Sequence, residues 1–284
     1  MQGKNHCNHI PFYASHEKTK FVMTKSVLFA YFLSLPLVMS WTMNDADFWL
    51  VEKKPTYTLF YRSSDTENKE EYIKLIDSGI RSVNSFFGTG FKNEFDVHIY
   101  PHRNLLDSTW SKDWKIKDFK SECWMVASGI ATKIDMISPK NWDKESCEHT
   151  YSDSLNTQRL IIHELVHVYH GQFNISPDFS DVENIDWFVE GLATYVSGQC
   201  DQERIAKIRA AVLGNNVPDS LRKFWTGNLR YGLSGSMVMY IDYKYGKSML
   251  ISLLKYNKVS DILTVLNTTE TEMIKGWKDY ILSL

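Results

Sequence analysis

Residues 157–171 constrain the fold of this chain more than any other segment. Apolar side chains there recur at helical spacing, and three of the nine histidines lie among them. Its centre reads His-Glu-x-x-His, from His163 to His167. Residues four apart share one face of an α-helix, so both imidazoles can bind one Zn²⁺. Glu164 lies beside them, where its carboxylate can accept a proton from zinc-activated water. His170 is off this face, and we expect it to be exposed or at the edge of the core. The pattern also fits a helix with two structural histidines.

A third ligand is needed for a catalytic zinc site, and the second apolar segment, residues 186–195, offers Glu190. An unpaired carboxylate among apolar neighbours is costly unless it meets a cation or becomes neutral. One Zn²⁺ per chain, held by His163, His167 and Glu190, removes that cost. Alternatively, Glu190 is a carboxylate favoured by the dipole near a helix start. We expect the small residues Gly191 and Ala193 to let this helix approach the first one closely.

These motifs resemble the gluzincin zinc metallopeptidases, in particular the peptidase MA-like group. His163-Glu-x-x-His167 is followed by Trp-Phe-x-Glu190-Gly-Leu-Ala, and the stretch Tyr231-Gly-Leu-Ser to Tyr245-Gly is similar to a downstream stretch of that family. The resemblance covers about residues 55–284. It implies a zincin-like fold and zinc-dependent hydrolysis of peptide bonds. It also indicates Tyr231 as a second catalytic residue that donates to the oxyanion, although Tyr231 could simply pack.

Spacing separates this chain from other zinc peptidases. The metzincin pattern requires a glycine and a histidine where this chain has His170 and Phe173. No Gly-x-Met-Glu-Asn motif for binding a substrate amine precedes the zinc helix, where we find only Val126-Ala-Ser-Gly129-Ile. We therefore expect an endopeptidase. Thermolysin-like enzymes have an Asp where this chain has Thr194, so a hydrogen-bond partner for the ligand histidines either comes from elsewhere or is weaker.

The fold class indicated is α+β. A mixed α/β N-terminal subdomain with a small sheet precedes a mainly helical C-terminal subdomain. A 43% apolar and 14% aromatic composition supports a globular core. The resemblance implies that the strand near 134–137 binds extended substrate along its edge. We divide the zincin-like domain, residues 41–284, into a strand-containing part, 41–155, and a helical part with the zinc site, 156–284. The expected strands are 56–61, 95–100 and 134–137, and the expected helices are 67–87, 155–171, 183–198, 202–213, 233–245, 247–256, 258–267 and 270–283.

The N-terminal residues 1–40 are expected to be an upstream extension plus a signal peptide. The apolar run 27–39 follows Lys25 and is shorter than the roughly 20 residues that span a membrane. The protein is therefore expected to be secreted or periplasmic, with an N-terminal membrane anchor at 27–41 as the alternative. In an oxidising compartment Cys123 and Cys147 are the favoured disulfide pair, with Cys200 left over.

The leading functional hypothesis is an exported zinc endopeptidase that acts on a peptide or protein substrate. A net charge of −2 without a basic block argues against a nucleic-acid partner. One alternative is a catalytically inactive gluzincin scaffold used for binding; another is a membrane-tethered assembly protein. The complete ligand set together with Glu164 argues against a degenerate site. Trp110, Trp114 and Trp124 either line a groove or fill the core.

Overall fold

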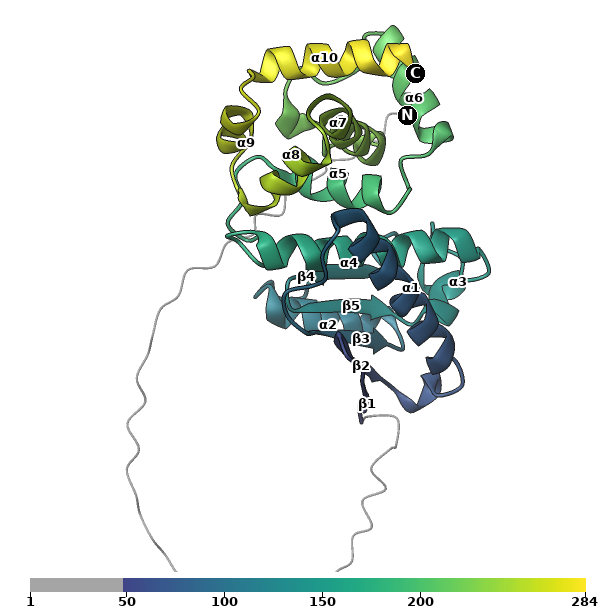
Figure 1. Ribbon diagram of the computed structural model, residues 1–284. Coiled ribbons are helices and arrows are strands. Elements are labelled where there is room, and N and C mark those ends of the chain that lie inside the picture. The colour runs from purple at the N-terminus through teal and green to yellow at the C-terminus, as the bar shows by residue number, and fades with distance from the viewer. Residues whose placement is uncertain (1–47) are drawn as a thin grey trace, which may run out of the picture.

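The computed structural model describes residues 48–284, so the expected leader or anchor lies outside the described residues. The chain forms a small sheet with flanking helices, followed by a mainly helical region (Figure 1), which confirms the predicted α+β class. Between residues 48 and 284, no helix is both long and apolar enough to cross a membrane. The strands are β1 (Leu50–Lys53), β2 (Tyr57–Tyr61), β3 (Phe95–Tyr100), β4 (Ala127–Ile130) and β5 (Lys133–Ile137).

Within the described residues these strands form one sheet in the order β1-β2-β3-β5-β4. Strands β2, β3 and β5 are parallel, and β1 and β4 pair antiparallel at the two edges. Alternate side chains of β2 are buried because successive residues point to opposite faces of a sheet. The expectation that the strand near 134–137 offers a free edge is wrong. Strand β5 lies between β3 and β4, and the edge on this side of the sheet is β4, which the apolar pattern broken by Gly129 did not reveal.

Three helices accompany the strands: α1 (Lys69–Phe87), α2 (Arg103–Asp113) and the short α3 (Trp142–Glu145). Helix α1 buries the apolar stripe expected from its sequence and ends at Gly88, whose φ of 75° is accessible to a residue without a side chain. Trp110 of α2 is buried and stacks on Trp114, with ring centroids 4.9 Å apart. These two tryptophans therefore belong to the core.

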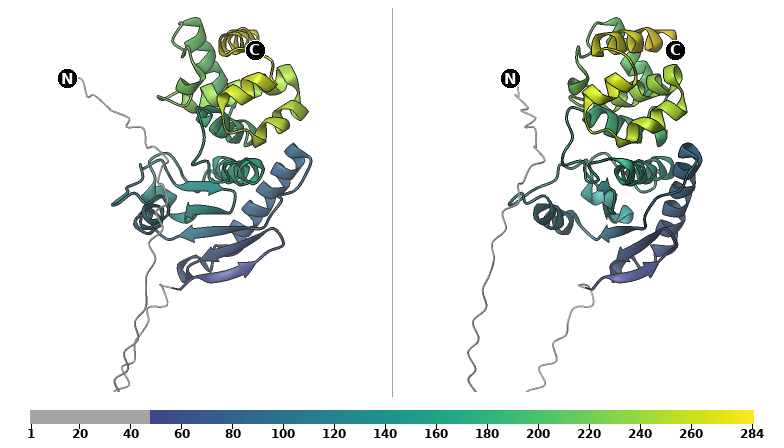
Figure 2. Two further views of the ribbon diagram at one scale, coloured as in Figure 1. Left: turned by 90° about the vertical axis from the view of Figure 1, so that its left-hand side faces the viewer. Right: turned by 60° about the vertical axis from the view of Figure 1, so that its left-hand side comes forward.

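Helix α4 (Ser154–Phe173) lies between the sheet and the helical region (Figures 1 and 2). Its residues from Leu160 to Gly171 are all buried, because β4 covers one side and α5 covers another. Beyond it the chain forms only helices within the described residues. They are α5 (Asp186–Val196), α6 (Gln202–Leu213), α7 (Arg230–Tyr245), α8 (Lys247–Ser252), α9 (Val259–Val265) and α10 (Glu270–Ser283).

Two glycines allow close backbone contacts around α4 and α5. A side chain at Gly129 of β4 would meet the carbonyl oxygen of Glu164, so the edge strand packs directly on the helix that carries the His-Glu-x-x-His motif. A side chain at Gly191 of α5 would meet the carbonyl oxygen of Ser234 in α7. The expectation that Gly191 brings α5 close to the first helix is therefore wrong. Gly191 instead lets α5 approach the backbone of α7.

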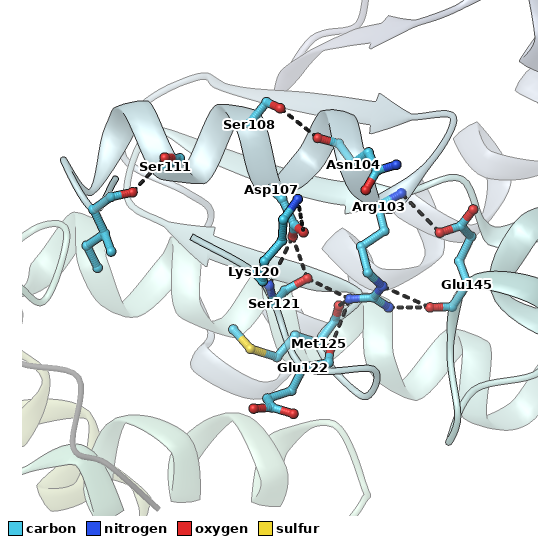
Figure 3. A network of polar contacts seen from close by, with 11 residues as sticks. Arg103, Asn104, Asp107, Ser108, Ser111, Lys120, Ser121, Glu122, Met125 and Glu145 are labelled. Carbon is cyan, nitrogen blue, oxygen red and sulfur yellow. Dashed lines mark hydrogen bonds and ion pairs between the residues drawn. The ribbon is translucent and has the colours of Figure 1, made fainter. Parts of the chain in front are cut away.

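Arg103, at the start of α2, holds the segment that leads into β4 (Figure 3). Its guanidinium donates to the carbonyl oxygens of Met125 at 2.7 Å and Glu122 at 2.9 Å. It also donates through Nε to the carbonyl oxygen of Glu145 at 3.0 Å. The predicted disulfide between Cys123 and Cys147 is confirmed, and it joins the same two stretches of chain. The position of Trp124 is therefore fixed by the disulfide at Cys123 and by the hydrogen bonds that Arg103 donates to Glu122 and Met125.

Candidate active site and metal centre

The structure brings together His163, His167 and Glu190, the three residues predicted to bind a metal. The Nε2 atoms of His163 and His167 lie 3.1 Å apart, because the residues are one turn apart on α4. The Oε2 atom of Glu190, from α5, lies 3.4 Å from Nε2 of His163 and 3.7 Å from Nε2 of His167. The three side chains thus present one donor atom each to a common point, all within 4.8 Å of one another.

This donor set fits a tetrahedral zinc ion. Zn–N and Zn–O bonds of about 2.1 Å at tetrahedral angles place ligand atoms roughly 3.4 Å apart, close to the spacing of these three atoms. Two imidazoles and one carboxylate also leave the fourth position open for water or substrate, as in catalytic zinc sites. Although desolvation acts to raise the pKa of Glu190, the imidazoles of His167 and His163 hold it well below its usual range. Glu190 is therefore present as a carboxylate, which is the form that binds a metal.

Glu164 lies in the same helix but in a different environment. It is only 8% exposed, and burial raises the pKa of its carboxyl group to about 7. The charge of Glu190 acts in the same direction, while His163 and the backbone of Gly129 oppose it. A carboxyl group with a pKa near neutrality can both accept and release a proton under ordinary conditions. The two carboxyl groups beside these histidines thus have pKa values shifted in opposite directions, up for Glu164 and down for Glu190.

Tyr231, in the first turn of α7, lies beside these groups. Its ring centroid is 6.2 Å from that of His163 in an edge-on arrangement. Burial raises the pKa of the Tyr231 phenol well above its usual range, and the negative charges of Glu190 and Glu164 add to this effect. The hydroxyl therefore keeps its proton at neutral pH and can act as a hydrogen-bond donor. Four different stretches of sequence thus meet here: α4, α5, α7 and the edge strand β4.

The partner of a ligand histidine, which the sequence left open, is Gln199. Its Oε1 atom lies 2.9 Å from Nδ1 of His163. Thr194 is fully buried, and its hydroxyl has no hydrogen-bond partner among the described residues. Gln199 follows α5 in an irregular segment with no periodicity, so no sequence signal indicated it. Nδ1 of His167, also buried, has no such partner within residues 48–284.

The expectation that His170 is exposed or at the edge of the core is wrong. Its side chain is completely buried against the rings of Phe179 and Phe188, at 5.0 and 5.6 Å. The reason is that α4 is covered on several sides, so a residue outside the ligand face is still inside the protein. Burial lowers the pKa of His170 to about 3, with His167 acting in the same direction, so the ring is neutral.

Comparison with known proteins places this site in a class. The family model described as Collagenase, Peptidase_M9, matches residues 116–281, which include α4, α5 and α7. The site and the match define a zinc metallopeptidase of the gluzincin type, as the sequence motifs predicted. The chain belongs to this collagenase family. None of the curated proteins matches the chain in sequence.

Solved structures of M1 zinc metallopeptidases are also similar to this chain. One, from Deinococcus radiodurans, has a TM-score of 0.44 and 16% sequence identity, and the match covers 79% of this chain and 48% of that one. Another, a variant of a two-domain M1 zinc metallopeptidase bound to L-arginine, has a TM-score of 0.41 and 13% identity over 80% of this chain and 48% of that one. The chain thus spans about half the length of these proteins.

Proposed function

We propose that the protein is an exported zinc endopeptidase in which His163, His167 and Glu190 hold the metal. The observation that carries this proposal is the convergence of these three donor atoms within 4.8 Å, next to the buried carboxyl group of Glu164. A non-catalytic scaffold would have no need to keep a carboxyl group of raised pKa beside the ligands. The site also contains a protonated phenol, which suits a reaction in which negative charge develops on a carbonyl oxygen.

The chemistry follows from the protonation states. When bound, zinc supplies Lewis acidity, which polarises a carbonyl group and makes water more acidic. Glu164 accepts the proton from the attacking water and then delivers it to the nitrogen of the leaving amine. The hydroxyl of Tyr231 donates a hydrogen bond to the oxyanion of the tetrahedral intermediate. At neutral pH Tyr231 keeps the proton that it donates, and the pKa of Glu164, near 7, allows this carboxyl group both to accept and to release a proton.

The edge strand β4 supports an extended peptide as the substrate. Strand β5 pairs with one side of β4 and no strand of the described residues pairs with the other, so an extended segment can add to this edge through main-chain hydrogen bonds. Residues 127–130 carry no acidic side chain that could hold a free substrate amine, which favours internal cleavage over removal of N-terminal residues. Because the family model is described as collagenase, collagen-derived peptides belong among the substrates to be tested.

Export is the second part of the proposal. The disulfide Cys123–Cys147 supports it, because such bonds persist mainly outside the cytosol. The apolar run at 27–39 is the proposed signal, with an anchor at 27–41 as the alternative. N-terminal sequencing of the protein recovered outside the cytoplasm tests this: a start after about residue 40 supports cleavage. Recovery of the whole run in the membrane fraction would support the anchor instead.

The experiment that tests the catalytic part uses two substitutions. Purified zinc-loaded protein is incubated with casein and with collagen-derived peptides, and new termini are identified by mass spectrometry. Glu164→Gln should keep its zinc and lose hydrolysis by about 10²–10⁴-fold, the usual contribution of a general base. Glu190→Gln should lose the metal as well. Full activity in Glu164→Gln would contradict the mechanism, and chelator-resistant activity would contradict a zinc site.

A further inference from the structure

Arg230 lies directly beside the proposed active site, and its surroundings are unusual for an arginine. The centre of its guanidinium is 4.6 Å from the ring centroid of Trp124, 5.5 Å from that of Trp225 and 5.2 Å from that of Tyr231. Trp225 itself packs edge-on against Tyr231 at 4.8 Å. Three aromatic rings thus surround this one cation, and each contributes cation–π attraction. Such contacts leave N–H donors of the guanidinium group available for hydrogen bonds.

The charge of Arg230 has no carboxylate counter-ion in the part of the chain that the structure describes. Within residues 48–284, no Asp or Glu carboxylate forms an ion pair with Arg230 or with Arg204, which lies 5.3 Å from the ring of Tyr231. Asp201, three residues before Arg204, pairs through its side chain with Arg159 instead, at 3.3 Å. Two half-buried guanidinium groups therefore flank one tyrosine without a carboxylate partner. The chain has more acidic than basic residues, so the lack of a carboxylate beside these two arginines does not reflect a shortage of acidic side chains.

The Arg230 guanidinium lies between the proposed zinc site and the segment that leads into β4. Tyr231, against which Arg230 lies, is 6.2 Å from the ring of His163. On the other side, Trp124 comes three residues before β4, the free edge along which we propose that substrate binds. The Arg103 clamp and the Cys123–Cys147 disulfide fix that segment. Arg230 therefore lies between Tyr231 of the helical region and Trp124 near the start of the edge strand.

We propose that Arg230, together with Arg204, recognises a carboxylate group of the peptide substrate close to the cleaved bond. A guanidinium group presents several N–H donors in a plane and matches a carboxylate with paired hydrogen bonds. The aromatic faces restrict its rotamers, so little conformational entropy is lost when the carboxylate binds. The group recognised is an acidic side chain in an internal position, or the terminal carboxylate of a short peptide. This inference rests on the proposed peptidase function and adds a substrate class to it.

The test measures binding separately from catalysis. Zinc-loaded Glu164→Gln protein, which should bind without cleaving, is titrated calorimetrically with short neutral peptides in which a single Glu is moved along the sequence. Matched peptides carry Gln at the same position. Peptides blocked by C-terminal amidation are compared with the free acids, so that a side-chain carboxylate and a terminal one are distinguished. The best Glu peptide, or the free acid, should bind about tenfold more tightly than its neutral counterpart.

Substitution of the arginine identifies the group responsible. Arg230→Gln in the same background should reduce this preference to about twofold or less, while Arg230→Lys should keep part of it because it keeps the charge. Arg209→Gln, at an exposed position of α6, is the matched control and should retain the full preference. Equal affinities for Glu and Gln peptides in the parent, or an unchanged preference in Arg230→Gln, would overturn the inference. Failure of the peptidase proposal is seen separately, as absence of casein hydrolysis by the wild-type protein.

Discussion

The Nδ1 atom of His163 donates its proton to the Oε1 atom of Gln199, 2.9 Å away and 36 residues later in the chain. This bond specifies the tautomer of the ring. With the proton on Nδ1, the Nε2 atom that faces Glu190 carries a free lone pair and can bind a metal. Gln199 belongs to the segment after α5, so the helix that supplies Glu190 also leads to the residue that orients His163.

Substitution of Gln199 should weaken zinc binding. Gln199→Leu removes the acceptor for Nδ1–H of His163, leaving the ring free to rotate, and should lower zinc affinity by about 10–100-fold. Competition with a chromophoric chelator measures this loss. Gln202→Leu, at an exposed position only three residues away, is the control and should leave the affinity unchanged. Equal affinity in both variants would show that the bond to Gln199 does not support the metal site.

Gly129→Ala should disturb the contact between the edge strand and the catalytic helix. Its new methyl group would meet the carbonyl oxygen of Glu164, which is backbone and cannot rotate away. We expect a loss of about 1–3 kcal/mol in the free energy of unfolding, as for other overpacked sites. Urea denaturation measures it. Ser128→Ala, on the opposite face of β4, should change stability by less than about 0.5 kcal/mol. A neutral effect of Gly129→Ala would mean that β4 does not pack on α4.

His170 should make the protein less stable in acid. Burial holds its pKa near 3, below the value of 6.5 it has when exposed, so the unfolded state binds a proton that the folded state does not. Its contribution to stability is complete above about pH 6.5 and decreases as the pH falls toward about 3. Between about pH 7.5 and about pH 5.5, wild-type protein should therefore lose about 1 kcal/mol more than His170→Gln.

Urea unfolding of the zinc-free protein at the two pH values provides this comparison, because the ligand histidines then contribute equally to both proteins. His102→Gln, at an exposed position, should show the wild-type pH dependence. If His170→Gln loses as much stability in acid as the wild-type protein, protonation of the buried His170 ring does not cause the loss.

Arg103→Met should destabilise the segment before β4. The change leaves the carbonyl oxygens of Met125 and Glu145 without their donors, and we expect a loss of about 2–4 kcal/mol. Thermal unfolding monitored by circular dichroism measures it. Arg103→Lys should not restore stability, because one ammonium group cannot reach carbonyl oxygens on both stretches. Arg209→Met, on the exposed face of α6, is the control and should be nearly neutral.

Local patterns in the sequence were sufficient for most of the secondary structure. The strand at 95–100 and the helices at 202–213 and 270–283 have the predicted bounds, because period-2 and helical spacing express local geometry. Strand β4 was missed because it is short, contains Gly129, and is half-exposed at an edge. Its pairing with β5, which makes β5 interior, depends on contacts that no local pattern encodes.

The sequence by itself determined the chemistry available to this protein: two histidines one helical turn apart, a glutamate between them, and a second glutamate 23 residues after the second histidine. Helical spacing makes that pair of ligands a local property. Only the tertiary structure decided that Gln199 lies beside His163, that His170 is buried, that β4 is an edge strand, and that no carboxylate of residues 48–284 pairs with Arg230 beside Tyr231. Each of these depends on packing between segments far apart in the chain. The burial of His170 and the surroundings of Arg230 arise only when the helices pack against one another.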